Sequence, residues 1–191
     1  MFSTALQFLI STVFNLLTLL FLLRFFLQQF KAPFNNPLTY MVVSLTDFAV
    51  KPARRLIPSL GKIDLSTLVL AFVAQLLMQF CLLWLRDLPI TLVGNAILIS
   101  IIGSSLLGVF RTMLDVFFYA ILLQVILSWV NPQSPISSAL NSLTKPILAP
   151  IQRILPATAG MDFSPIVAII LIQMLNVSVV RTFEQQLLSL Y

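Results

Sequence analysis

Apolar stretches as long as a lipid bilayer is thick constrain this chain more than any other feature. They cover residues 2–24, 66–85, 88–130 and 164–181 of the 191-residue chain. A transmembrane helix needs about 20 such residues, because each rises about 1.5 Å across a hydrocarbon core about 30 Å thick. Residues 1–23 also lack the basic start and small-residue cleavage site of a secretion signal, so we expect a retained span there.

Composition agrees with a membrane protein and excludes several kinds of site. Hydrophobic residues make up 59% of the chain and charged residues only 9%, whereas a soluble domain is about one quarter charged. Histidine is absent and Cys81 is the single cysteine, which removes the usual zinc and haem ligands and any disulfide framework. No phosphate-binding loop or nucleophile motif occurs. We therefore expect no catalytic residue, metal or cofactor.

Two basic, proline-punctuated segments show that the chain contains a duplication. They read KPARRLIPSLGKIDLS at residues 51–66 and APIQRILPATAGMDFS at residues 149–164. Twelve residues of the first copy recur 98 positions later: Pro37, Ser44, Leu45, Thr46, Pro52, Arg55, Pro58, Asp64, Ser66, Val69, Gln75 and Leu77 match Pro135, Ser142, Leu143, Thr144, Pro150, Arg153, Pro156, Asp162, Ser164, Val167, Gln173 and Leu175. Upstream, at an offset of 100, LLRFFLQQF faces LLQVILSWV.

The duplication predicts an all-α integral membrane protein with four transmembrane helices in two tandem repeats. Each repeat is a span, an interfacial hairpin segment and a second span. The first repeat covers residues 1–87, with spans at about 2–24 and 66–85, and the second covers 104–191, with spans at about 104–130 and 164–181. Residues 88–103 remain as an extra apolar linker helix that lies at the interface or re-enters the bilayer.

The distribution of positive charge predicts which side of the membrane holds the hairpin segments. Eight basic residues surround them, and two flank the opposite ends of the spans. The eight are Arg24, Lys31, Lys51, Arg54, Arg55, Lys62, Lys145 and Arg153, and the two are Arg86 and Arg181. Short basic loops stay cytoplasmic, so both hairpin segments are expected inside. A fifth span over 88–103 would invert the second repeat, as happens in transporters, and stays an alternative.

Each hairpin segment contains a short amphipathic helix followed by a proline elbow. We expect the helices to start at Asn36-Pro37 and Ser134-Pro135 and to lie on the bilayer surface. A second proline, Pro52 or Pro150, should then open a turn. The remaining elbow residues are Pro58, Asp64 and Ser66 in the first copy and Pro156, Asp162 and Ser164 in the second.

Basic residues on the elbows are the candidate contacts for anionic phospholipid or a partner. They are Lys51, Arg54, Arg55, Lys145 and Arg153. The main hypothesis places these side chains at lipid headgroups. A second hypothesis pairs Arg55 and Arg153 with the elbow aspartates, or with a bound anion. A third treats the elbows as ordinary solvated loops.

Polar residues also lie inside the apolar stretches. They are Asn15, Gln75, Arg111, Asp115, Gln173 and Asn176. The amides are expected to form hydrogen bonds between helices. Arg111 and Asp115 are one helical turn apart and could neutralise each other, but ionisable groups within a span indicate function by default. A role in transport therefore stays open for these two residues.

The repeated pattern resembles the repeat of the YggT/YlmG family of bacterial and plastid membrane proteins. The segments NPLTYMVVSLTDFAVKPARRLIPSLGKIDLS and SPISSALNSLTKPILAPIQRILPATAGMDFSP carry the resemblance, although Gln152 replaces the first arginine of the motif in the second copy. The resemblance implies a bacterial inner-membrane protein. It also implies loose links to osmotic tolerance and potassium homeostasis, to division, and in plastids to cytochrome maturation. The lack of histidine argues against direct haem handling here.

These observations favour a non-catalytic organising or assembly factor of the inner membrane. Its elbows would engage anionic lipid and a membrane-protein partner, or the chain would form a homo-oligomer. Nucleic acid is not an expected partner, because the net charge of +5 gathers mostly at one membrane face. The alternative is a small oligomeric channel or transporter for ions or water, lined by Arg111, Asp115 and the span amides.

Overall fold

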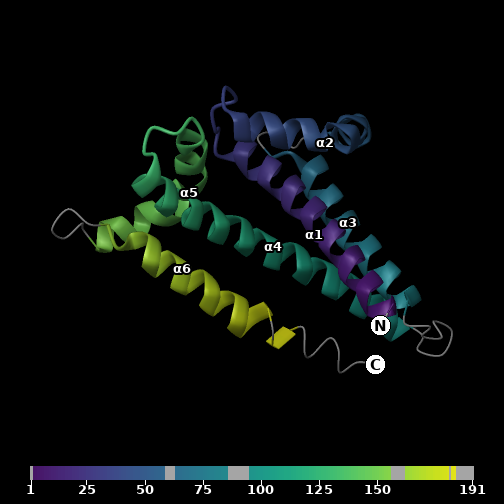
Figure 1. Cartoon of the computed structure of the whole chain (residues 1–191). Coiled ribbons are helices and arrows are strands. Elements are labelled where there is room, and N and C mark those ends of the chain that lie inside the picture. The colour runs from purple at the N-terminus through teal and green to yellow at the C-terminus, as the bar shows by residue number, and fades with distance from the viewer. Residues whose placement is uncertain (1, 59–62, 86–94, 156–161, 181, 184–191) are drawn as a thin grey trace.

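Every regular element of the structure, a computed structural model, is a helix. The structure describes residues 2–58, 63–85, 95–155, 162–180 and 182–183. The elements in chain order are α1 (Phe2–Gln29), α2 (Pro37–Leu56), α3 (Leu65–Leu85), α4 (Asn95–Val130), α5 (Ser137–Ile154), α6 (Ser164–Leu175) and a π-helical turn, η1 (Asn176–Val180) (Figure 1). The predicted all-α fold is confirmed.

Three of these helices are long and apolar enough to cross a membrane. They cover Ser3–Gln29, Leu65–Leu85 and Leu98–Val130. The segment Ser164–Val180, formed by α6 and η1, is apolar but shorter, with an axial length of about 26 Å at about 1.5 Å per residue. The fourth crossing therefore stays a prediction.

The third long helix corrects one predicted boundary, the boundary between the linker helix and the third span. Helix α4 begins at Asn95 and continues unbroken to Val130, so residues 95–103 belong to it and do not form a separate linker helix. Residues 88–94 lie outside the described part of the chain. The small polar residues do not interrupt the helix, because Ser105 Oγ donates 2.7 Å to the carbonyl oxygen of Ile101 within the same helix.

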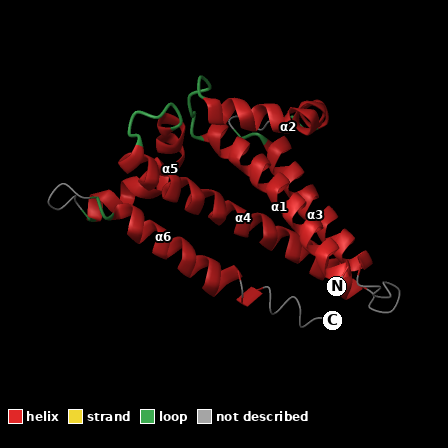
Figure 2. Cartoon of the chain, in the orientation of Figure 1, coloured by secondary structure: helices red, strands yellow, loops and turns green. Residues whose placement is uncertain are grey.

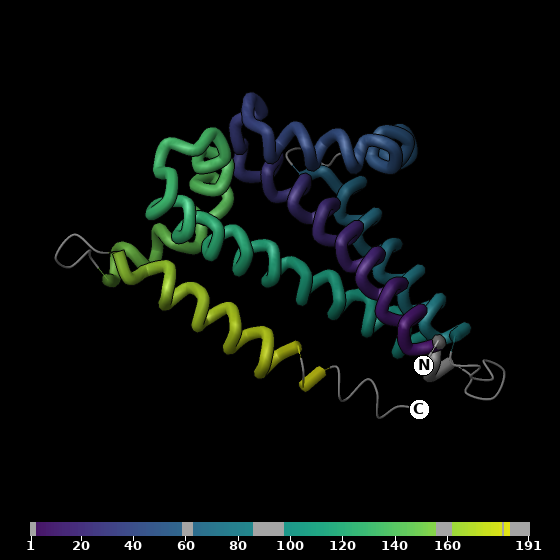
Figure 3. Tube along the Cα trace, in the orientation of Figure 1, coloured from purple at the N-terminus to yellow at the C-terminus, as the bar shows by residue number. Residues whose placement is uncertain are grey.

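The two amphipathic helices lie at one end of the spans. The loops that lead into α2 and α5 both lie at this end (Figure 2), whereas the start of α1, the end of α3 and the start of α4 gather at the opposite end (Figure 3). Helix α1 packs along α3, α4 packs against both, and α6 packs on α4 and α5. One hydrophobic cluster joins α1–α5, and a smaller one, with Ile121, Leu148, Ala168 and Ile172 at its centre, holds α6.

Proline does not end the amphipathic helices where the sequence suggested. Pro52 lies inside α2, and Pro146 and Pro150 lie inside α5, so the turns predicted to open at Pro52 and Pro150 are absent. A proline removes one backbone hydrogen bond and bends a helix, but the helix can continue beyond it. The ribbons of α2 and α5 both change direction along their length (Figure 1).

The starts of the two amphipathic helices also differ. Asn36 caps α2 by accepting a hydrogen bond of 2.9 Å from the backbone nitrogen of Thr39, as the sequence predicted. Helix α5 begins later, at Ser137, and Ile136 at its cap makes no side-chain cap bond. Ser134, the expected cap, accepts only a long contact of 3.4 Å from the nitrogen of Ile136.

Candidate functional site at the membrane interface

The first elbow, residues 51–66, is closed by an ion pair. Arg54 lies in the last turn of α2, and its Nε and Nη2 atoms donate to Oδ2 of Asp64 at 3.2 and 2.5 Å. Asp64 is 9% exposed, and its position just before α3 brings the end of one helix to the start of the next. Ser66 Oγ donates 3.0 Å to the carbonyl oxygen of Ile57 and adds a second closure.

The second elbow, residues 149–164, makes the corresponding contact without a cation. Gln152 occupies the repeat position of Arg54, and its Nε2 donates 2.8 Å to Oδ2 of Asp162. Asp162 Oδ1 accepts 2.8 Å from the backbone nitrogen of Ser164. Burial raises the pKa of Asp162, but the hydrogen bonds from Ser164 and Gln152 outweigh it and leave this pKa below its usual value. Pro156 lies outside the described residues.

The arginine shared by both copies remains free. Arg55 and Arg153 are exposed in the last turns of α2 and α5, and in the described part of the chain neither makes an ion pair or a side-chain hydrogen bond. The hypothesis that they pair with the elbow aspartates is therefore not what the structure shows. Their preceding neighbours, Arg54 and Gln152, take that role, because consecutive helical positions point about 100° apart.

The other two predicted contact residues, Lys51 and Lys145, also differ between the copies: in the part of the chain that the structure describes, one is paired with an acid and the other is not. Lys51 Nζ lies 2.8 Å from Oδ2 of Asp47 in an ion pair one turn apart on α2. Lys145, at the repeat position of Asp47, is exposed and has no ion pair among the described residues.

A buried arginine, expected from the sequence to be one of the eight basic residues around the hairpin segments, holds α2 against α1. Arg24 is 4% exposed and lies within α1, which continues past it to Gln29. Its Nη1 donates to Thr46 Oγ1 at 2.8 Å and to Asp47 Oδ1 at 2.9 Å. Hydrogen bonds from Lys51 and Arg24 hold the pKa of Asp47 below its usual value.

The second repeat makes the equivalent junction with amides. Gln124 is the counterpart of Arg24 in the aligned segments LLRFFLQQF and LLQVILSWV. Its Oε1 accepts a hydrogen bond from the hydroxyl of Thr144, the counterpart of Thr46, and its Nε2 donates 2.7 Å to Oδ1 of Asn141. That alignment was the signal in the sequence that could have identified both junctions.

Within the spans of the first repeat, the polar groups meet. Gln75 is fully buried, and its Nε2 donates 3.1 Å to both Asn15 Oδ1 and Thr18 Oγ1 on α1. Gly108 of α4 faces the same amide, and a Cβ there would lie 2.4 Å from Gln75 Oε1. A side chain at this position would displace the Gln75 amide, so glycine lets α3 and α4 approach with the amide in place.

Within the spans of the second repeat, the polar groups make one long contact. Gln173, the counterpart of Gln75, is exposed and makes no side-chain hydrogen bond in the described ranges. Asn176 instead donates from Nδ2 to Oδ1 of Asp115 at 3.5 Å. Arg111 is exposed and forms no ion pair, not even with Asp115, among the described residues.

The residues that are described bring no three His, Cys, Asp or Glu side chains into a group that could hold a metal ion. The polar contacts are instead helix junctions and elbow closures. Exposed cations remain at one end of the spans, a geometry suited to binding anions at a surface.

Comparison with known proteins identifies relatives along nearly the whole chain. The profile of the CCB3/YggT family matches residues 3–85 and again residues 103–183, one match for each copy of the duplication. The protein YggT of Escherichia coli strain K12 is 35% identical over 94% of this chain and 91% of its own length. A Vibrio alginolyticus protein encoded in the proC 3′ region is 36% identical over 90% of this chain and 91% of its own. A Haemophilus influenzae protein is 31% identical over 87% of each chain. No solved structure matches.

Proposed function

The chain belongs to the CCB3/YggT family, and from that premise we propose that it is a non-catalytic organising or assembly factor of the bacterial inner membrane. It binds anionic phospholipid through the exposed arginines of its two elbows and presents the same surface to a protein partner. The observation that carries the proposal is the matched position of Arg55 and Arg153. We add links to osmotic tolerance, potassium homeostasis or division to the proposal only because the family resemblance implies them.

Charge and topology support a cytoplasmic position for both elbows. Helices α2 and α5 lie at the same end of the spans (Figure 1), and eight of the eleven Lys and Arg residues fall in or beside the segments that contain them. The excess of basic residues in short loops marks the cytoplasmic side. With α6 and η1 as a fourth crossing, two crossings separate the elbows and both chain termini face the opposite side.

In each elbow, one residue bonds the aspartate and the next residue is exposed, and this arrangement supports contact with lipid headgroups. One residue, Arg54 or Gln152, closes the elbow onto its aspartate. The next residue, Arg55 or Arg153, has no such task and is exposed. Each basic side chain near an anionic membrane surface contributes about 1 kcal/mol of attraction, so a free arginine at both elbows favours anionic lipid over zwitterionic lipid.

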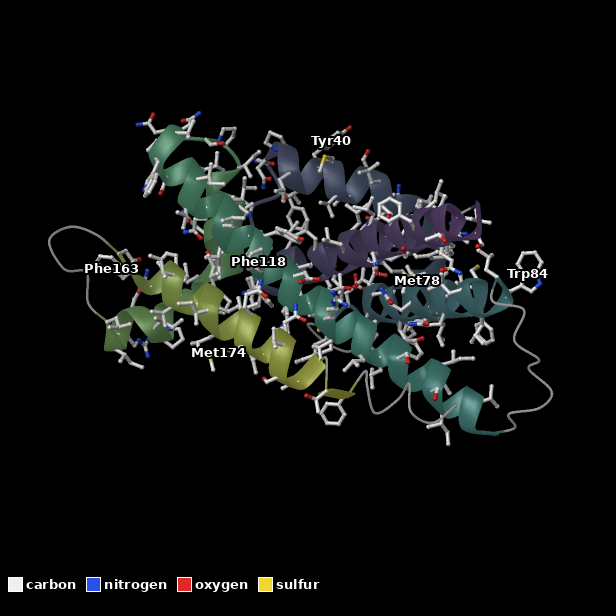
Figure 4. All side chains as sticks on the ribbon, turned by 60° about the horizontal axis from the view of Figure 1, so that its bottom comes forward. Tyr40, Met78, Trp84, Phe118, Phe163 and Met174 are labelled. Atoms are coloured by element: carbon white, nitrogen blue, oxygen red, sulfur yellow. The ribbon has the colours of Figure 1, made fainter. Side chains whose placement is uncertain are left out.

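The outer face of α2 supports an interfacial position for the first elbow. Its exposed side chains include the large apolar or aromatic residues Tyr40, Met41, Leu45 and Phe48, and Lys51 and Arg55 are exposed on the same helix. Figure 4 shows Tyr40 on the outer side of α2. Aromatic and apolar side chains beside lysine and arginine are typical of helices that lie in the headgroup region.

Native mass spectrometry of the protein in nanodiscs tests the proposal. The nanodiscs contain phosphatidylcholine and phosphatidylglycerol, and the quantity measured is the ratio of the two lipids that stay bound after release. Arg55→Gln with Arg153→Gln should lower the preference for phosphatidylglycerol about 30-fold, from about 1 kcal/mol for each arginine. The control variant, Lys31→Gln with Lys51→Gln, also removes two positive charges, both from the segment between α1 and α3. It should lower the preference for phosphatidylglycerol less, because Lys51 is already paired with Asp47. An unchanged preference in the double arginine variant would contradict lipid binding at the elbows.

A further inference from the structure

A polar stripe runs along one face of α4. Its members recur every three or four residues and therefore share one side of the helix. They are Ser104, Gly108, Arg111, Asp115 and Tyr119. Arg111 lies near the middle of the candidate span Leu98–Val130, one turn from Gly108, which meets Gln75 in the middle of Leu65–Leu85. The two charges of the stripe therefore lie at the depth of the hydrocarbon core.

Within one chain, the two charges form no close ion pair among the described residues. Arg111 is exposed and has no ion pair or side-chain hydrogen bond among the described residues. Asp115 has one long contact, 3.5 Å from Asn176. An unpaired arginine or aspartate at the centre of a membrane costs about 2.5 kcal/mol or more. A partner that lies against this face of α4 would lower this free-energy cost.

We propose that a second copy of this chain covers the polar stripe, in a parallel dimer whose twofold axis is normal to the membrane. Arg111 of each copy pairs with Asp115 of the other. The stripe carries one base and one acid about 6 Å apart along the same helix face. A twofold axis normal to the membrane keeps each residue at its own depth, so the long Arg111 side chain reaches along the interface to Asp115 of the other copy, and the symmetry forms this contact twice. Ser104, one turn beyond Gly108 on the stripe, has a small side chain that lets two backbones approach closely.

This inference goes beyond the proposed function and does not depend on it. Lipid binding rests on the elbows, whereas the dimer rests on the middle of α4. Because the two copies have the same orientation, the dimer places four elbows on one membrane face. Failure of the dimer test would leave the lipid test untouched, and the reverse is also true.

A charge-complementation experiment tests the pairing. One chain carries Arg111→Asp and therefore has two acids on the stripe, and the other carries Asp115→Arg and has two bases. Each is labelled with a donor or an acceptor dye, reconstituted in phosphatidylcholine and phosphatidylglycerol liposomes, and measured by energy transfer. Each variant alone should lose at least ten-fold in dimer population relative to the native chain. The mixture should recover it, because both ion pairs form again between the unlike copies. Dimers from each variant alone, or no recovery in the mixture, would overturn the proposal.

Cross-linking tests the same face on a chain with native charges, in case a charge variant fails to insert. In a Cys81→Ser background, Tyr119→Cys on the stripe should cross-link to its counterpart through a short thiol reagent. Leu106→Cys is the control, because it is exposed on the opposite side of α4. Equal cross-linking at both positions would contradict the proposed face. So would a monomeric protein whose liposomes pass ions until Asp115→Asn is introduced, since the stripe would then line a path.

Discussion

In the first repeat Arg24 joins its span to the amphipathic helix through Thr46 and Asp47, whereas at the same place in the second repeat Gln124 meets Thr144 and Asn141. The threonine is common to both junctions, and the charge is not. The elbows repeat this difference, with an ion pair in one copy and an amide in the other. The comparison teaches that the architecture needs a hydrogen-bonded contact at each place, while the charge belongs to one copy.

The spans differ in a second way. Gln75 is buried in a node between α1, α3 and α4, but its counterpart Gln173 is exposed and the contact to α4 comes from Asn176, three residues later. In the first repeat, the Gln75 amide group therefore donates its hydrogen bonds to side chains of the same chain. The second repeat leaves Gln173 and Arg111 without partners in the described chain, so its outer face has the properties of a surface for association.

Removing the charged junction should give the largest loss of stability. We expect Arg24→Ala to lower the free energy of unfolding by about 3 kcal/mol, because hydrogen bonds to a charged donor are lost at a buried site. Arg24→Gln should lower it by only about half as much, since glutamine meets the corresponding threonine in the second repeat. Titration with SDS in mixed micelles measures both. Equal losses would show that the two junctions are not interchangeable.

Substitution of the two glutamines tests whether the node exists in one repeat only. Gln75→Met should cost about 1 kcal/mol, because two interhelical hydrogen bonds are lost at about 0.6 kcal/mol each. Gln173→Met should change the unfolding free energy of the monomer by less than about 0.5 kcal/mol, as exposed substitutions usually do. The same titration applies. A cost at Gln173 as large as that at Gln75 would remove the difference between the repeats.

Copying the first elbow into the second should give a smaller effect. Gln152→Arg is expected to form an ion pair with Asp162 like that of Arg54 with Asp64, and to stabilise the protein by about 0.5 kcal/mol at low salt. The gain should vanish at high salt. Gln152→Arg combined with Asp162→Asn is the control. A gain that persists in the control would have another cause.

Acidification should have the smallest effect on stability, and this effect should still differ between the two repeats. Hydrogen bonds hold the pKa of Asp47 and of Asp162 below the usual value. Each carboxylate therefore adds stability that is present above the unfolded pKa of about 3.9 and is lost as the pH falls through the folded pKa. Thermal unfolding between pH 6 and pH 3 should show this loss. Asp47→Asn should flatten the acid limb more than Asp162→Asn, because two cations face Asp47 and only neutral donors face Asp162. An acid limb unchanged in Asp47→Asn would contradict this.

The helical architecture and its duplication were predictable because both depend on patterns that need no tertiary information. Apolar runs specify spans, and a fixed offset specifies the copies. The boundaries were less predictable, because Pro52 and Pro150 bend helices without ending them and residues 95–103 continue into α4. A shift of one helical position rotates a side chain by about 100°, which is why Arg54 rather than Arg55 faces Asp64.

Other contacts could not be predicted, because they depend on how the helices pack and not on the repeated sequence pattern. The sequence places Arg24 at a membrane boundary, and only the contacts with α2 show that it is buried. Likewise, the match of Gln173 to Gln75 predicts a shared role, but α6 meets α4 in a different register and brings Asn176 to Asp115 instead.

The sidedness of the two elbows tests the whole account most directly. In a Cys81→Ser background, single cysteines at the positions of Arg55 and Arg153 are exposed to a membrane-impermeant maleimide in right-side-out and inside-out vesicles. A cysteine at the position of Trp84, exposed at the far end of α3 (Figure 4), is the control for the opposite face. We predict that both elbow cysteines react only in inside-out vesicles and that the control reacts only in right-side-out vesicles. Labelling of the two elbows from opposite faces would contradict the shared lipid-binding surface and would favour an inverted repeat.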